Sequence, residues 1–127
     1  MPKFNKAERL CNAIDINHLF SVGQSISQYP IKIKWLPAGN DNNVQLKVVI
    51  SVSKHRFKRA VDRNRIKRVI RECFRLNKHI LQQVLGTRQC HLALIYMGKE
   101  IADFTTLEPI IIGLFHRLTK EYEKLAG

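Results

Sequence analysis

One stretch limits the fold of this chain more than any other: residues 54–78, which read KHRFKRAVDRNRIKRVIRECFRLNK. It holds eleven Lys or Arg residues against two acidic residues, so its net charge is +9 in a chain whose total is +12. Apolar residues recur through it at helical spacing, which places the charge on a folded element and not on a disordered tail. The stretch therefore predicts a helix with one side in a core and cations on the other side.

If each residue of this stretch is turned by about 100° from the one before, as in an α-helix, its residues divide between two faces. One face collects polar residues: Asn64, Lys67, Arg68, Arg71, Arg75 and Lys78. The opposite face collects apolar ones: Ile66, Val69, Ile70, Cys73, Ile80, Leu81 and Val84. Cations spaced four residues apart repel each other unless a polyanion neutralises them, and the Arg guanidinium can hold a phosphate with two parallel hydrogen bonds. This favours nucleic-acid binding over a merely solvated helix face. It also disfavours a membrane-surface helix, because the core needs the apolar side.

The N-terminal part of the chain predicts one helix and two strands. Apolar spacing predicts a helix within residues 5–23. Strict alternation of apolar and basic residues predicts a strand at 29–36, and a high content of β-branched residues predicts a second strand at 44–52. A turn cluster at residues 37–43 separates them, so we expect the two strands to pair as an antiparallel hairpin.

The C-terminal part predicts two helices around a buried strand. The basic helix should run over residues 58–85 and end at Gly86, followed by an apolar strand at 90–97. The spacing of Thr105 and Glu108 fits a capping box that opens the last helix. The order α–β–β–α–β–α predicts a single α+β domain over residues 1–127, a sandwich of helices on a small sheet. The crossover between the strands at 44–52 and 90–97 should have the usual right hand.

Composition excludes several classes of protein. No run approaches the roughly 20 apolar residues that span a bilayer, and no secretory signal is visible, so we expect no membrane association. Cys11, Cys73 and Cys90 lack CxxC spacing, which predicts free thiols in a reducing cytoplasm. 

The chain shows no pattern typical of a catalytic site or a metal site. Asp62 and Glu72 lie among arginines and are expected to be salt-bridge partners rather than an acid–base pair. Cys90 and His91 are neighbours on a predicted strand, so their side chains should point to opposite faces. We therefore expect the chain to contain neither catalytic residues nor metal ligands.

Several motifs resemble the signature of the bacterial ribonuclease P protein family. The resemblance rests on Ser51-Val-Ser-Lys54, on Arg59-Ala60, and on the run of residues 63–72, whose Arg-Asn-Arg core is Arg63, Asn64 and Arg65. Lys6, Arg9 and Leu10 are similar to the N-terminal K-x-x-R-L of that family, and Asp15, Phe20 and Gly23 fit its next pattern. 

The resemblance implies a fold and a function. The implied fold is α–β–β–β–α–β–α, like domain 2 of ribosomal protein S5, with a left-handed crossover that replaces the right-handed default. The implied function is that of the protein subunit of ribonuclease P, which binds a catalytic RNA and the 5′ leader of precursor tRNA. The RNA subunit would remove the leader with magnesium ions, with no cofactor intrinsic to the protein and no protein partner required.

The resemblance and the helical phase together indicate which residues would contact RNA. The RNA-binding residues would be Lys54, Arg56, Lys58, Arg59, Arg63, Asn64, Arg65, Lys67, Arg68 and Arg71. Asn64 could instead cap a turn. The leader-binding residues would be Phe20, Lys32 and Lys34. An aromatic residue at the spacing of Phe20 is more often part of a core, and the two lysines could equally be an ordinary exposed sheet face, whereas Trp35 is expected in the core.

Two other classes of function remain open from the residues alone. One is a non-enzymatic module such as a ribosomal protein or a DNA-binding protein, whose helix would read base edges. The other is a stand-alone nuclease, which the lack of paired carboxylates disfavours. Structured or single-stranded RNA is recognised more through shape, stacking and phosphate contacts.

Overall fold

The computed structural model of the protein describes residues 8–38 and 44–126. Its elements follow in the order α1 (Ala13–Val22), β1 (Gln24–Gln28), β2 (Ile31–Ala38), β3 (Leu46–Val52), α2 (Ala60–Asn77), α3 (His79–Leu85), β4 (Gln89–Tyr96) and α4 (Phe104–Ala126). The fold is α+β, and the order agrees with α–β–β–β–α–β–α, with α3 as a short extra helix after α2.

The strands form one mixed sheet in the order β1-β2-β4-β3. β2 is antiparallel to both β1 and β4, whereas β3 is parallel to β4. The predicted hairpin of residues 29–36 with 44–52 is therefore wrong: both segments are strands, but β4 lies between them. The reason is burial, since β4 is buried along nearly its whole length and an apolar strand of this kind is most stable inside a sheet.

Strand β1 was not predicted from the alternation pattern. Its sequence QSISQ has one apolar residue, Ile26, and the other four residues are exposed. It is an edge strand that pairs only with β2, which is why it needs little apolar surface.

The parallel pairing of β3 with β4 makes α2 and α3 a crossover connection. Its left hand and the single-domain organisation stay predictions.

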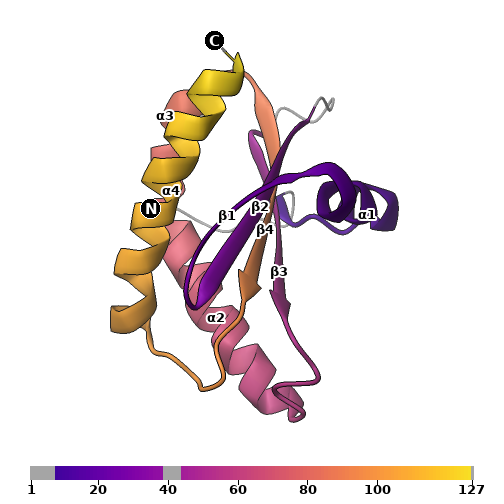
Figure 1. Ribbon diagram of the computed structural model, residues 1–127, viewed down its shortest axis with the longest axis vertical. Coiled ribbons are helices and arrows are strands. Elements are labelled where there is room, and N and C mark those ends of the chain that lie inside the picture. Colours follow the sequence, from indigo (N-terminus) through magenta and orange to yellow (C-terminus); the bar gives the residue numbers. More distant parts are fainter. Residues whose placement is uncertain (1–7, 39–43, 127) are drawn as a thin grey trace.

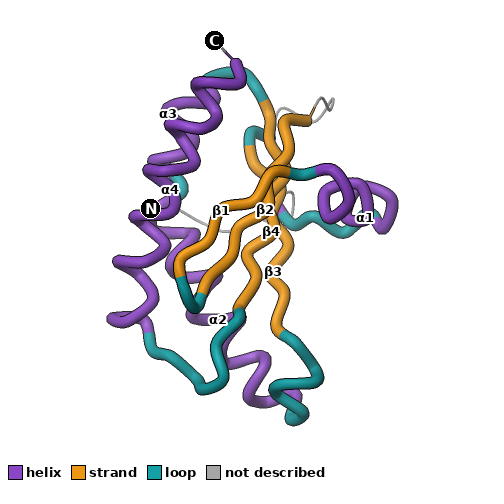
Figure 2. The backbone as a smooth tube through the Cα atoms, viewed as in Figure 1, coloured by secondary structure: helices purple, strands orange, loops and turns teal. Residues whose placement is uncertain are grey.

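The helices cover the two faces of the sheet unequally (Figures 1 and 2). Helices α2, α3 and α4 lie on one face, and α1 lies alone on the other. The face covered by α2, α3 and α4 carries the main core, which includes the fully buried Trp35, Phe74 and Phe115. The rings of Phe74 and Phe115 pack edge to face, with 6.4 Å between their centres. Leu19, Ala93 and Leu10 form a small second core under α1. One sheet face is thus sealed, and the other is only partly covered.

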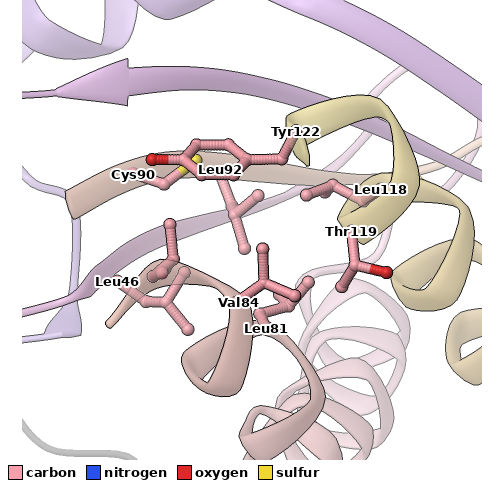
Figure 3. A pocket seen from close by; sticks show the side chains of 9 residues that line it. Leu46, Leu81, Val84, Cys90, Leu92, Leu118, Thr119 and Tyr122 are labelled. Atoms are coloured by element: carbon pink, nitrogen blue, oxygen red, sulfur yellow. The ribbon is translucent and has the colours of Figure 1, made fainter. Parts of the chain in front are cut away.

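A cavity between the layers of the sealed side is too small for a ligand. Figure 3 shows the side chains around a cavity between β4, α3 and α4, with Leu92, Leu118 and Tyr122 among them. Its volume is about 10 Å³, which is at most enough for one water molecule.

The basic helix is shorter than predicted. Residues 58–85 were expected to form one helix, but α2 ends at Asn77 and α3 begins at His79. The amide of Asn77 donates to the carbonyl of Cys73 at 2.9 Å and to the carboxylate of Glu108 at 3.0 Å. A side chain that bonds the carbonyl four residues back competes with the helical ladder and bends it. Gly86 ends α3 with φ of 60°, as expected.

The ends of the outer helices also differ from the prediction. Helix α1 starts at Ala13, where the side chain of Asn12 accepts hydrogen bonds from the amides of Ile14 and Asp15; residues 5–7 of the predicted helix lie outside the described residues. Residues 39–43 of the predicted turn also lie outside them. Helix α4 is capped by Asp103, whose carboxylate accepts from the amide of Thr106 at 3.0 Å, so the capping box is wrong. Asp is a preferred N-cap because its oxygen satisfies a free amide.

All three cysteines are free, as predicted. Cys11 is exposed, whereas Cys73 and Cys90 are buried, and burial raises the pKa of both buried thiols to about 12. Neither buried thiol is a nucleophile near neutral pH, since the thiolate is the reactive form.

Among the described helices, none is long and apolar enough to cross a membrane.

Candidate nucleic-acid interface

The loop between β3 and α2 presents cations from a fixed backbone. The hydroxyl of Ser53 accepts hydrogen bonds from the amides of His55 and Arg56 at 3.1 and 3.3 Å. Phe57 is buried and packs against the ring of Tyr96, with 6.0 Å between the ring centres. The loop is anchored at both points, and the predicted residues Lys54, Lys58 and Arg59 are exposed on it.

Two predicted RNA-binding arginines also hold this loop together. Arg63 donates from Nη1 to the carbonyls of Phe57 and Lys58 at 2.7 and 3.0 Å. Arg56 donates to the carbonyl of Met97 across the gap between two loops. These hydrogen bonds orient both guanidinium groups and leave each with further N–H donors. They are therefore structural as well as candidate contact residues.

Helix α2 carries its cations on its outer side and on both flanks. Asn64, Arg65 and Arg68 are exposed, whereas Lys67 and Arg71 are half-buried. Lys67 and Arg71 line a hollow of about 180 Å³ beside β3, and Arg9 closes the same hollow from the N-terminal segment. The buried face of α2 contains Ile66, Ile70 and Cys73, as the helical phase predicted. The apolar side thus fixes the rotation of the helix and turns its cations outward.

Asn64 does not act as a helix cap. The N-cap of α2 is Arg59, and Asn64 lies five residues further on, exposed within the helix. Its side chain is available for a ligand.

The two acidic residues of this region are salt-bridge partners, as predicted. Asp62 lies 4.0 Å from Arg59, and both oxygens of Glu72 accept hydrogen bonds from Arg75. The hydrogen bond from Arg75 lowers the pKa of Glu72 below its usual value. Glu72 is therefore a carboxylate near neutral pH. 

One predicted member of the cationic face is buried. Lys78 is 8% exposed, and its ammonium group donates to both carboxylate oxygens of Glu8 at 2.9 and 3.1 Å. The end of α2 turns Lys78 inward, and the N-terminal segment brings Glu8 to it. The ladder of exposed cations thus stops before the end of α2.

The predicted leader-binding residues lie together on the sheet face that carries α1. Lys34 donates from Nζ to the carbonyl of Phe20 at 2.6 Å, and the same atom lies 5.9 Å from the centre of the Phe20 ring. Phe20 is half-buried and packs against the small core, so it is a core residue that is still partly exposed. Trp35 points to the opposite face and is fully buried, as expected.

Lys32 belongs to a row of four residues, three of them polar, that crosses the whole sheet. The strand register places Ser27, Lys32, Ile95 and Ser51 side by side on β1, β2, β4 and β3. None of the four is buried. The row lies on the partly covered face of the sheet. The sequence alone showed only Lys32, because the other members lie on strands whose pairing was not predictable.

Cys90 and His91, which are neighbours on β4, do not face each other. Cys90 faces the main core and His91 the opposite side, and burial lowers the pKa of His91. Within residues 8–38 and 44–126, no group of three or more His, Cys, Asp or Glu residues could hold a metal ion.

The protein-family model described as Ribonuclease P matches residues 4–119. The chain belongs to the ribonuclease P protein family. A relative from Porphyromonas gingivalis, named ribonuclease P protein component, is 39% identical over 106 residues, which cover 82% of this chain and 77% of the relative. One of the same name from Chromohalobacter salexigens is 33% identical over 121 residues, covering 95% of this chain and 89% of the relative. The chain is thus a protein component of ribonuclease P, a subunit of an endoribonuclease.

Solved structures of the ribonuclease P protein family agree with this fold. The ribonuclease P protein from Thermotoga maritima matches with a TM-score of 0.69 and 27% identity, covering 87% of this chain and 96% of that one. The protein from Staphylococcus aureus, at 22% identity and a TM-score of 0.62, shares the fold and covers 84% of this chain and 90% of that one. The resemblance seen in the Arg63–Arg65 motif is thereby confirmed, and so is the α+β element order that it implied.

Proposed function

We propose that this chain binds the catalytic RNA of ribonuclease P through α2 and the loop before it, and holds the 5′ leader of precursor tRNA on the sheet face beside α1. The observation that carries the proposal is the cationic surface of that loop and helix. Its exposed members are Lys54, Arg56, Lys58, Arg59, Arg65 and Arg68. The place of action would be the cytoplasm.

The RNA contact follows from charge and rigidity. From Arg65 to Arg71 the helix rises roughly 9 Å, at about 1.5 Å per residue, so its cations can meet successive phosphates of one strand. Binding of this kind releases counterions, which makes it strong and salt-dependent. Arg63 and Arg56 support it by holding the loop in place, and Lys67 and Arg71 with Arg9 offer a second point of contact beside β3.

The leader contact follows from the partly covered sheet face. A single-stranded segment needs cations for its backbone and flat side chains for its bases. Lys32 and Lys34 supply the charge, and the exposed part of Phe20 supplies an aromatic surface beside Lys34. The row from Ser27 to Ser51, polar except for Ile95, gives the single-stranded leader a path across the sheet.

Cleavage itself is assigned to the RNA subunit. Asp62 and Glu72 are engaged by arginines, and the thiols of Cys73 and Cys90 are held in their neutral form. The protein would position RNA and lower its charge repulsion, while magnesium ions bound by the RNA carry out the hydrolysis. The protein requires no other protein partner for this role.

Reconstitution with a cognate ribonuclease P RNA tests the proposal. At a magnesium concentration too low for the RNA alone, adding the protein is expected to restore cleavage of precursor tRNA, because its cations replace part of the screening that magnesium supplies. The measurement is the rate of release of the leader with and without protein. An unchanged rate, or a preference for duplex DNA over RNA in competition, contradicts the proposal.

Leader binding has a separate test. The holoenzyme is expected to bind precursor tRNA more tightly than mature tRNA, because only the precursor reaches the sheet face. Lys32→Ala should reduce this preference several-fold by removing one backbone contact. Lys120→Ala, an exposed cation on α4, is the matched control and should leave the preference as in the wild type. Equal affinities for the two tRNAs in the wild type would rule out the leader contact.

A further inference from the structure

A second groove lies beside α2, on the flank away from β3. Its volume is about 840 Å³, which is within the range of small-molecule binding sites. It is lined by the turn between β1 and β2, the loop between β4 and α4, the first turns of α4, and Arg65 of α2. In Figure 1 these segments meet at the lower end of the molecule, on the side of the sheet opposite α1. It is therefore separate from the sheet face that carries Phe20 and Lys34.

The walls of this groove are held in place. The amide of Met97 donates to the carbonyl of Pro30 at 2.7 Å, which ties the two loops together. The hydroxyl of the buried Tyr96 donates to the carbonyl of Glu100 and fixes the loop from below. Gly98 passes directly over this ring, since a Cβ atom there would lie 2.5 Å from the Tyr96 hydroxyl oxygen. A ligand would thus meet a site that is already formed.

The side chains that face the groove have a specific combination of chemistry. Tyr29 is 64% exposed, unusually open for a large aromatic residue. Arg65 and Lys99 are exposed cations on the same lining. An exposed aromatic ring offers a surface on which a base can stack, and nearby cations can hold its phosphate. 

The acids on the lining favour a nucleotide over a continuous phosphate backbone. The Asp103 carboxylate is engaged in capping α4, where it accepts from Thr105 and Thr106 at 3.0 Å each. The Glu100 side chain is exposed, and a carboxylate accepts hydrogen bonds from the amino groups of bases. The two cations and two acids of the lining cancel in net charge, so the groove attracts a phosphate backbone less than the outer side of α2 does, while it can still contact one base and one phosphate.

We propose that this groove holds an unpaired nucleotide of the RNA subunit, with its base stacked on Tyr29 and its phosphate near Arg65 and Lys99. The inference rests on the proposed binding of the RNA subunit through α2. It commits to that RNA because Arg65 belongs to the helix in question, whereas the sheet face proposed for the leader is on the other side. Tyr29 would be a recognition residue that senses a base, in addition to the ionic contacts of α2.

The test compares Tyr29→Ala, Tyr29→Phe and wild type in binding to the RNA subunit alone, without tRNA, over a range of salt concentrations. Tyr29→Ala is expected to weaken binding about 10-fold, because stacking is lost. The salt slope should stay unchanged, because no ionic contact is removed. Tyr29→Phe should stay within about 2-fold of the wild type. A benzoylphenylalanine placed at position 29 should crosslink to an unpaired nucleotide of the RNA subunit.

Leu125→Ala, which trims another exposed apolar side chain at the far end of α4, is the matched control and should bind as the wild type. Thermal melting of each variant excludes loss of folding. If the wild type itself does not bind the RNA subunit, the proposed function fails. If the wild type binds and Tyr29→Ala binds equally well, or if the crosslink maps to the leader of precursor tRNA, the groove inference alone is overturned.

Discussion

Replacing Arg65 and Arg68 together with alanine is expected to weaken binding to the RNA subunit by roughly 20-fold at 0.15 M salt. Both side chains are exposed on the outer side of α2, so their removal should leave the fold intact. Each lost phosphate contact lowers the slope of log K against log salt by about 0.7–0.9 units, which predicts a slope reduced by about 1.5. Filter binding over a salt series measures both quantities.

The matched control is Lys120→Ala with Lys124→Ala. This pair also removes two exposed cations, so its net charge equals that of the α2 variant. It lies on α4, away from the proposed contact surface, and its slope should equal that of the wild type. If both double variants lose the same slope, binding depends on total charge and α2 has no special role.

Replacing Lys78 with methionine is expected to destabilise the protein by about 3–5 kcal/mol. The side chains of Lys78 and Glu8 are 11% and 8% exposed, so the variant leaves a carboxylate in a poorly solvated site. Removing one partner of a buried ion pair costs far more than the pair contributes, because the other charge has lost both water and its counter-charge. The free energy of unfolding in urea measures the loss.

Two further variants separate this effect from a general loss of charge. Lys124→Met breaks the exposed pair with Glu121, whose atoms are 3.9 Å apart, and should change stability by less than about 1 kcal/mol. Glu8→Leu combined with Lys78→Met removes both buried charges and should recover most of the stability. A double variant no more stable than Lys78→Met would show that the pair is not the source of the loss.

This ion pair also links the N-terminal segment to the proposed interface. Glu8 is followed by Arg9 in the hollow with Lys67 and Arg71, and the amide of Leu10 donates to the carbonyl of Val48 at 2.9 Å. Since Leu10 is buried under α1, the segment is fixed at both residue 8 and residue 10. Loss of the pair should therefore free the amide of Leu10 for faster hydrogen exchange.

Much of the candidate interface was predictable because its chemistry is local. The helical phase correctly placed Ile66, Ile70 and Cys73 in the core and Arg68 outside. The sequence motif around Arg63 and Arg65 is contiguous in the chain, so it indicated the family without any knowledge of tertiary contacts. Strands at 29–36, 44–52 and 90–97 followed from alternation and β-branched residues, which are likewise local signals.

The partners of these elements were not predictable from the same signals. Alternation of apolar and polar residues shows that a segment is a strand but not which strand lies beside it. Strand β4, which follows the crossover helices in the chain, lies between β2 and β3. Lys78 had the phase of an exposed cation, yet it meets Glu8, which lies 70 residues away in the chain. The hydrogen bond that holds Arg56 likewise depends on Met97, 41 residues away.

The sequence by itself determined the cationic helix, its apolar side and the family, because each depends on the order of neighbouring residues. Only the tertiary structure decided the strand order, the burial of Lys78 and the meeting of Tyr29 with Arg65 in one groove. The physical reason is that these features arise from contacts between distant segments. Such contacts form where burial of apolar surface for the whole chain is most favourable, and no local pattern encodes that sum.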